Sequence, residues 1–296
     1  MNEFELIDEI VAAFTSRDSP WLRVGPGDDA AVLRVPEGFE VAGSIDSFLS
    51  GVHFPARSAP ELIAYRCLMA SLSDLAAMGA EPAWALVALN LPEPDRDCVA
   101  AIAEGLAEAA RDAGVVIAGG NLASGPLALG ISVHGWAPAG SLLLRSGARP
   151  GDAVCVSGPL GGAALALDTL DLAASVPGPL SELEENYWRP QPPFALAARL
   201  RSRATSCIDV SDGLLQDLGH LCRASGLGAS LDSAAVPLAI CARLEHALGD
   251  CDDYVLCFTT PDSGLRRDFN VVGEMTDRPG LLLDGKPVAA SGYRHF

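Results

Sequence analysis

Lysine is nearly absent from this chain of 296 residues: Lys286, in "LLLDGKPV", is the single one. A Walker A loop needs Gly-Lys-Ser/Thr after a glycine-rich turn, and "GKP" does not supply it. Acidic residues outnumber basic ones by 38 to 20, so the formal net charge is −18. Because binding to nucleic acid requires a basic face, this balance argues against nucleic acid as a partner. Any phosphate would have to be held through metal ions, arginine or backbone N–H groups.

Long apolar runs and paired cysteine motifs are also missing. No run approaches the roughly 18 apolar residues that a membrane span requires. The eight cysteines form no C-x-x-C pair, and most of them sit in apolar surroundings. Such cysteines are typical of reduced thiols in the cytoplasm rather than of disulfides or zinc sites. We therefore expect a cytoplasmic protein with neither a membrane nor a nucleic acid as partner.

The length and the hydrophobic fraction of 49% indicate about two domains with real cores. Strand-like and helix-like segments alternate in both halves, which predicts an α/β or α+β fold. The stretch "PAGSLLLRSGARPGD" reads as a connector, so the predicted domains are residues 1–139 and 140–296. The pattern also predicts a strand over 39–49 and helices over 60–78, 161–174 and 238–248.

Aspartates gather in four stretches, each at a predicted strand end or helix start. They are "VGPGDDAAVL" with Asp28 and Asp29, "GSIDSFL" with Asp46, "SLSDLAAMGA" with Asp74, and "IDVSDGLLQDLGH" with Asp209, Ser211, Asp212 and Asp217.

Each stretch alone has a structural interpretation. Turn chemistry explains Asp28 and Asp29, because Gly and Pro set the backbone and Asp bonds its own main chain. The fourth stretch could be an ordinary helix N-terminus with a capping side chain. Asp74 is different, since its helix is otherwise apolar and an unpaired carboxylate there carries a desolvation cost. Several carboxylates in a chain with one lysine together favour Mg²⁺, which binds oxygen ligands and phosphate.

These motifs resemble the thiamine-monophosphate kinases, which share a superfamily with aminoimidazole ribonucleotide synthase. "SDLAAMGA" and "IDVSDGLLQDLGH" are its most specific signals, "GPGDD" is less specific, and the resemblance runs over nearly the whole chain. It implies a homodimer of two-domain α/β subunits. The N-terminal domain, a mixed sheet with helices, would bind ATP and metal and form the dimer. The C-terminal domain would be α/β.

The resemblance also implies an activity and a set of site residues. Thiamine monophosphate would accept the γ-phosphate of ATP, with several Mg²⁺ ions bound. No catalytic side chain is expected, because a phosphate with a second pKa near 6 is largely ionised at neutral pH and needs no general base. The implied metal ligands are Asp29, Ser44, Asp46, Asp74, Asn121, Asp209 and Asp212, the ATP contacts are Gly120, Asn121, Arg145 and Ser211, and the acceptor contacts are His53 and Asp252.

The chain departs from the family pattern at three places. Ile45 stands between Ser44 and Asp46 where the family has a second hydroxyl, and Asn121 replaces a carboxylate after Gly119-Gly120. We expect both changes to weaken metal binding beside Asp46. The aromatic residue expected just before "GYRHF" is replaced by Ala290 or Ser291. Two alternatives therefore stay open: an impaired paralogue that binds nucleotide or thiamine phosphate, and a sister ATP-using enzyme with another acceptor.

Overall fold

The computed structural model of the chain describes residues 3–14, 19–249 and 251–293. The chain divides into two compact units and changes from one to the other between Ala139 and Gly140. Residues 76–80 belong to the second unit and 171–181 to the first. Both units mix helices with sheet, so the predicted two-domain α/β class is confirmed. None of the helices in the described ranges is long and apolar enough to cross a bilayer.

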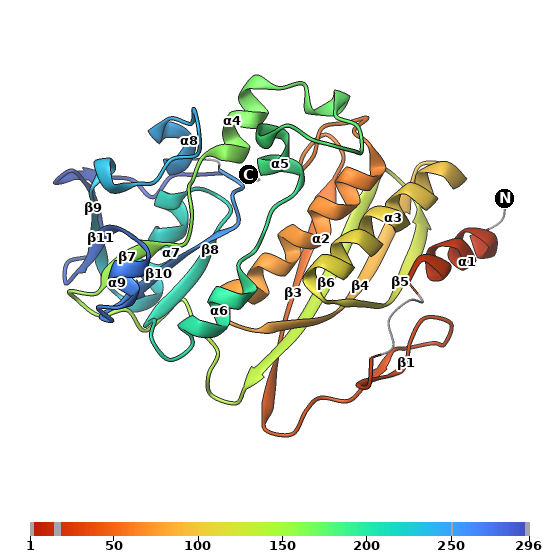
Figure 1. Cartoon of the computed structure of the whole chain (residues 1–296), viewed down its shortest axis with the longest axis horizontal. Helices are drawn as coiled ribbons and strands as arrows, with labels where there is room; N and C mark the ends of the chain where they lie inside the picture. Colours follow the sequence, from red (N-terminus) through yellow and green to blue (C-terminus); the bar gives the residue numbers. More distant parts are fainter. Residues whose placement is uncertain (1–2, 15–18, 250, 294–296) are drawn as a thin grey trace. The chain divides into compact units, whose positions relative to one another are not determined.

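The first unit is built on a four-stranded sheet with the strand order β3-β6-β4-β5 (Figure 1). Neighbouring strands are antiparallel except β4 and β5, which are parallel and joined by the helix α3. The elements of this unit are α1 (Glu3–Phe14), β1 (Leu22–Val24), β2 (Val32–Leu33), β3 (Phe39–Leu49), α2 (Pro60–Ala77), β4 (Glu81–Leu91), α3 (Arg96–Ala113), β5 (Val116–Ser124), β6 (Ala128–Pro138) and the 3₁₀ turn η1 (Leu172–Ala174), with the end of α2 assigned to the second unit.

Strand β3 presents two different faces to its surroundings. Ala42 and Phe48 are buried, and Ser44 and Asp46 between them are half-buried. Since successive side chains of a strand point to opposite sides, these four share one face. Ser44 bonds to Asp74 on α2, so this is the helix face of the sheet. The opposite face, here called the open face, carries exposed apolar side chains at Val41, Ile45 and Leu49 of β3 and Leu86 of β4.

The second unit contains a seven-stranded sheet with the order β13-β12-β9-β11-β7-β10-β8. All neighbours are antiparallel except β9 and β12. The elements are β7 (Ala153–Val156), α4 (Gly162–Thr169), α5 (Glu182–Trp188), α6 (Phe194–Leu200), β8 (Ser206–Val210), α7 (Leu214–Ser225), β9 (Gly228–Leu231), η2 (Ser233–Ala235), α8 (Leu244–Leu248), β10 (Val255–Thr260), α9 (Leu265–Asp268), β11 (Asn270–Thr276), β12 (Gly280–Leu283) and β13 (Lys286–Val288).

Alternation along β7 builds a core on each side of this sheet. Val154 and Val156 pack into a cluster that includes Leu218 of α7. Cys155 points the other way and packs with Leu200 of α6 and Phe258. Val210 at the end of β8 and Leu214 at the start of α7 belong to the first cluster, so buried apolar contacts hold both places.

Two predicted helices are shorter than the sequence pattern indicated. The helix expected over 161–174 ends at Thr169, because Leu170 adopts an extended backbone with φ −112° and ψ 148°. The helix expected over 238–248 begins only at Leu244. Cys241 lies in the left-handed region with φ 64°, and Arg243 is extended, so the preceding residues cannot continue a helix. Local backbone conformation, which apolar spacing does not reveal, sets both limits.

Helix α4 begins with a glycine-rich turn whose backbone N–H groups are occupied by a carboxylate. Asp253 accepts hydrogen bonds from the N–H groups of Gly161, Gly162 and Ala163. Burial raises the pKa of Asp253 from 3.8 to about 6, although these N–H groups act in the opposite direction. The first turn of α4 thus has an internal anion, which complements the helix dipole.

The raised pKa of Asp253 predicts a pH-dependent stability. The folded chain holds this proton more tightly than the unfolded chain, so the stabilisation is complete below about pH 4 and is lost as the pH rises through 6. Asp253→Asn removes this titration. We expect the free energy of unfolding to fall more steeply between pH 4 and 7 in the wild type than in the variant, by at most about 3 kcal/mol. Urea titrations across this range measure the difference, and parallel pH curves would contradict it.

Candidate functional site

Ser44, Asp46 and Asp74 come together on the helix face of the first unit. Ser44 and Asp46 lie two residues apart on β3 and therefore point the same way. The Ser44 hydroxyl donates to Oδ2 of Asp74 at 2.5 Å. The structure thus brings together three of the residues predicted to bind metal.

Asp46 is half-buried beside a second carboxylate. Burial is the main cause that raises the pKa of Asp46 to about 6, and the negative charge of Asp74 adds to it. The hydroxyl of Ser71 opposes this rise in pKa. Within the described ranges no arginine, lysine or histidine forms an ion pair with Asp46 or Asp74. Two carboxylates in this situation would be stabilised by a bound cation.

Asn121 lies on the other face of the same sheet. It pairs with Ala88 on β4, which is opposite Gly130 on β6. Asp46, by contrast, is opposite Ile131, one residue further along β6. Because a shift of one residue reverses the direction of a side chain, this register assigns Asn121 to the open face. The structure does not bring Asn121 and Asp46 together on one face of this sheet.

Gly120 lies where two strands approach closely. A Cβ atom at this position would come within 2.1 Å of the carbonyl oxygen of Val87 on β4. A side chain here would therefore displace the backbone of β4. This explains the glycine locally, whereas a contact between Gly120 and ATP stays a prediction.

Asp29 and His53 lie in loops outside the strands and helices of the first unit. Asp29 is exposed, and its N–H group donates to Oδ1 of Asp28 at 2.8 Å, as the turn interpretation expects. The Nδ1 atom of His53 accepts from the N–H group of Leu49 at 3.0 Å, and its ring meets Phe48 edge to face. His53 therefore folds back onto the end of β3. The roles predicted for Asp29 and His53 stay predictions.

In the second unit, Asp209 lies near the end of β8, and the sharp turn from β8 to α7 carries Ser211 and Asp212. Gly213 closes this turn with φ 117°, and a Cβ atom there would lie 1.7 Å from the carbonyl oxygen of Gly249. Only glycine fits such a position. The structure thus brings together the three predicted residues of "IDVSDG".

Asp217 holds the turn from within α7. Its Oδ2 atom accepts the N–H groups of Ser211 and Asp212, each at 3.1 Å. Burial, followed by the negative charges of Asp209 and Asp212, raises the pKa of Asp217 to about 8. Asp217 belongs to the predicted motif, but no role was predicted for it. Its bonds to the N–H groups of Ser211 and Asp212 depend on how the turn folds.

The C-terminal segment reaches the same turn through Gln216. The amide nitrogen of Gln216 donates to Oδ2 of Asp212 at 2.9 Å and to the carbonyl oxygen of Tyr293 at 2.8 Å. The N–H group of Tyr293 also donates to the carbonyl oxygen of Asp212 at 3.1 Å. Ala290, one of the two residues in place of the expected aromatic, packs against the core that contains α7. Gln216 is a further residue that sequence reasoning did not single out.

Asp252 and Arg145 are placed differently with respect to this turn. The N–H group of Asp252 donates to the carbonyl oxygen of Ser211 at 2.9 Å, so Asp252 adjoins the turn. Arg145 is exposed, and its carbonyl oxygen accepts a bond from Ser225 near the end of α7. Burial, followed by the positive charges of Arg223 and Arg145, lowers the pKa of His220. Arg145 therefore lies near the later part of α7.

The donor set fits Mg²⁺ in chemistry but forms no closed cage. None of the described residues forms a group of three or more His, Cys, Asp or Glu side chains with the geometry of a metal site. Mg²⁺ is commonly held by one or two carboxylates together with water and substrate phosphates. Asp46 with Asp74, and Asp209 with Asp212, are pairs of this kind within their own units.

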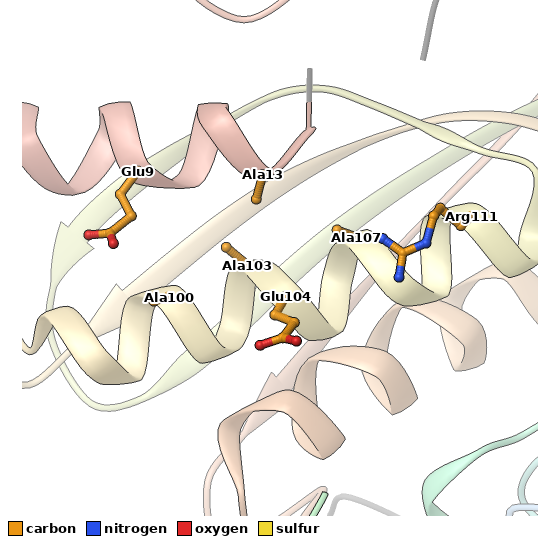
Figure 2. A pocket seen from close by; sticks show the side chains of 7 residues that line it. All are labelled: Glu9, Ala13, Ala100, Ala103, Glu104, Ala107 and Arg111. Carbon is orange, nitrogen blue, oxygen red and sulfur yellow. The ribbon is translucent and has the colours of Figure 1, made fainter. Parts of the chain in front are cut away.

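A groove of about 300 Å³ in the first unit lies elsewhere, between α1 and α3 (Figure 2). It contains none of the predicted site residues, and its two carboxylates and one guanidinium do not favour a phosphate. Glu9 is already paired with Arg96 at 2.9 Å. The groove is lined by Glu9, Ala13, Ala100, Ala103, Glu104, Ala107 and Arg111.

Comparison with known proteins covers both units of the chain. Residues 27–137 match the family model described as AIR synthase related protein, N-terminal domain, and residues 149–284 match the corresponding C-terminal domain. The thiamine-monophosphate kinase of Salmonella typhimurium is 38% identical over 301 residues, which cover 93% of this chain and 92% of that protein.

Solved structures give the same result. The thiamine-monophosphate kinase of Stenotrophomonas maltophilia superposes with a TM-score of 0.86 at 36% identity, covering 97% of this chain and 98% of that one. A structure described as AaThiL complexed with AMPPCP and TMP gives a TM-score of 0.81 at 29% identity, covering 99% and 97%. From the match over both domains and the identity to curated relatives, the chain belongs to the thiamine-monophosphate kinase family.

Proposed function

We propose that this protein transfers the γ-phosphate of ATP to thiamine monophosphate and so forms thiamine diphosphate. The observation that carries the proposal is the half-buried pair Asp46 and Asp74, which has no basic partner within the described ranges. Family membership supplies the reaction, because the relatives are named for it. A cytoplasmic location, predicted because the cysteines form no C-x-x-C pair and most lie in apolar surroundings, is part of the same proposal.

In this reaction a phosphate oxygen of the acceptor forms a bond to the γ-phosphorus, and the bond from that phosphorus to the ADP oxygen breaks. The acceptor phosphate is largely ionised at neutral pH, so no side chain has to remove a proton. The remaining difficulty is the repulsion between two anionic substrates. Bound Mg²⁺ would neutralise phosphate oxygens and fix their positions.

The residues of the chain have positioning roles in this proposal. Asp46, Asp74, Asp209 and Asp212 would hold metal, with Ser44 and Asp29 as further ligands. In the first unit, Gly120 and Asn121 would contact ATP and His53 the acceptor. In the second unit, Ser211 and Arg145 would contact ATP and Asp252 the acceptor. The hydrogen bond from Ser44 to Asp74 and the N–H bonds to Asp217 support it, because they order these groups before any ligand binds.

A homodimer through the open face completes the proposal. Ile45 is 71% exposed and Val41 is 46% exposed on one strand of this face. Apolar side chains gathered on a sheet face are typical of an interface. Asn121 lies on the same face by register, so a second copy would pack near it.

The direct test is incubation of the purified protein with Mg-ATP and thiamine monophosphate. We expect thiamine diphosphate, detected by mass spectrometry, to appear in step with ADP. ADP without thiamine diphosphate would mean that the γ-phosphate went to water, and it would favour a sister enzyme whose own acceptor is missing from the mixture. Binding of nucleotide without any turnover would indicate the impaired paralogue.

Removing one carboxylate from either pair, Asp46 with Asp74 or Asp209 with Asp212, should abolish nucleotide binding. We expect Asp74→Asn and Asp209→Asn to abolish Mg-ATP binding in calorimetry while both variants stay folded, since each loses one negative charge and keeps its size. Asp112→Asn is the matched control in the first unit, because Asp112 also accepts a hydroxyl, that of Tyr65 at 3.0 Å. Unchanged nucleotide affinity in both site variants would rule out their assignment as metal ligands.

A charge on the open face should separate the dimer. We expect Ile45→Asp to shift the protein from dimer to monomer in light scattering at micromolar concentration. A buried, unpaired carboxylate would oppose association. Ile240→Asp is the control, because Ile240 is 70% exposed and lies in the second unit. A wild type that is already monomeric would contradict the proposed interface.

A further inference from the structure

The segment Asp252–Tyr254 has an unusual backbone. Asp252 has φ 50° and Tyr254 has φ 53°, both in the left-handed region that residues with a Cβ atom seldom adopt. Two such residues on either side of Asp253 need compensating contacts. Asp252 is also predicted to contact the substrate. The contacts that hold this segment therefore affect where that side chain lies.

Asp253 supplies three of these contacts. One of its oxygens accepts the N–H groups of Gly162 at 3.0 Å and Ala163 at 3.2 Å, and the other accepts the N–H group of Gly161. The bonds join residues that are about 90 positions apart in sequence. The carboxylate therefore anchors the strained segment to the first turn of α4.

Asp252 is held on its other sides as well. The hydroxyl of Tyr254 donates to Oδ1 of Asp252 at 2.8 Å. The backbone N–H groups of Asp252 and Tyr254 donate to the carbonyl oxygens of Ser211 and Val210, both at 2.9 Å. The Asp252 carboxylate is thus fixed relative to the turn that carries Ser211.

The bonds to Asp253 also decide whether the glycine-rich turn before α4 is available to bind a ligand. Backbone N–H groups at the start of a helix are a common binding place for phosphate. Here the N–H groups of Gly161, Gly162 and Ala163 already bond to a carboxylate of the same chain. This turn therefore serves to position a neighbouring segment.

We propose that Asp253 is a positioning residue, which clamps the strained Asp252–Tyr254 segment to the start of α4 and so fixes the carboxylate of Asp252 for the acceptor. The inference rests on the proposed function, in which Asp252 contacts the acceptor. A fixed carboxylate suits an acceptor that carries both a cationic heteroaromatic ring and an amino group, because it can attract the first by charge and accept a hydrogen bond from the second.

The test compares two capping aspartates of the same unit. Asp262 also accepts N–H groups at the start of a helix, from Gly264 at 2.8 Å and Leu265 at 2.9 Å, but it lies at α9. We expect Asp253→Asn to raise the KM for thiamine monophosphate about tenfold, with the KM for ATP changed less than twofold. Asp262→Asn should change neither value. A helix cap with no positioning role would lower stability in both variants and leave both KM values alone.

Hydrogen exchange provides a readout that does not depend on activity. In Asp253→Asn, amides in 251–256 and 158–163 should exchange faster than in the wild type, and those in 262–268 should not. Unchanged exchange in 251–256 would overturn the clamp. Faster exchange in 251–256 with an unchanged KM for thiamine monophosphate would show that Asp253 does not position Asp252 for the acceptor.

Two further outcomes are decisive. If the wild type does not phosphorylate thiamine monophosphate, the proposed function fails, and exchange alone still decides whether Asp253 clamps the segment. If Asp253→Asn does not fold, Tyr254→Phe replaces it, because this change removes the hydroxyl that donates to Asp252. A smaller rise in the acceptor KM is then expected, and no rise would overturn the positioning of Asp252.

Discussion

The constraint on which this structure depends is the placement of many aspartates in a chain with few cations. With 38 acidic and 20 basic residues, most carboxylates cannot be paired with a basic side chain. Backbone N–H groups take that role at several places, as in the bonds to Asp95, Asp217 and Asp253. These bonds favour the charged form without a cation, although burial outweighs them and raises the pKa of Asp217 and Asp253. They also define helix starts and a tight turn.

A second class of aspartate has no such arrangement. Asp46 faces Asp74 across the gap between β3 and α2, and burial adds to the repulsion. In the second unit, the negative charges of Asp209 and Asp212 raise the pKa of Asp217. The first class explains the fold locally, whereas Asp46 and Asp74 form no ion pair with a basic side chain of the described residues. This difference in surroundings, rather than the presence of aspartate as such, separates structural carboxylates from candidate ligands.

Features with a local cause could be predicted from the sequence. The strand over 39–49 has the predicted bounds because apolar and polar residues alternate along it, and the helix that carries Asp74 ends one residue from its predicted limit. The bonds between Asp253 and residues 161–163 could not be predicted, since about 90 residues separate the partners. The same holds for Gln216 and Tyr293. Long-range contacts of this kind leave no mark in the spacing of residues.

The register of the first sheet also changes how the departures from the family pattern are interpreted. The family pattern predicts that Ile45 and Asn121 weaken the site that contains Asp46. By strand alternation both belong to the open face, whereas Asp46 and Ser44 belong to the helix face. Within one subunit their effect on Asp46 would therefore have to pass through the backbone. A large exposed apolar side chain at 45 instead favours burial against another surface, so this substitution bears more directly on association than on the carboxylate pair.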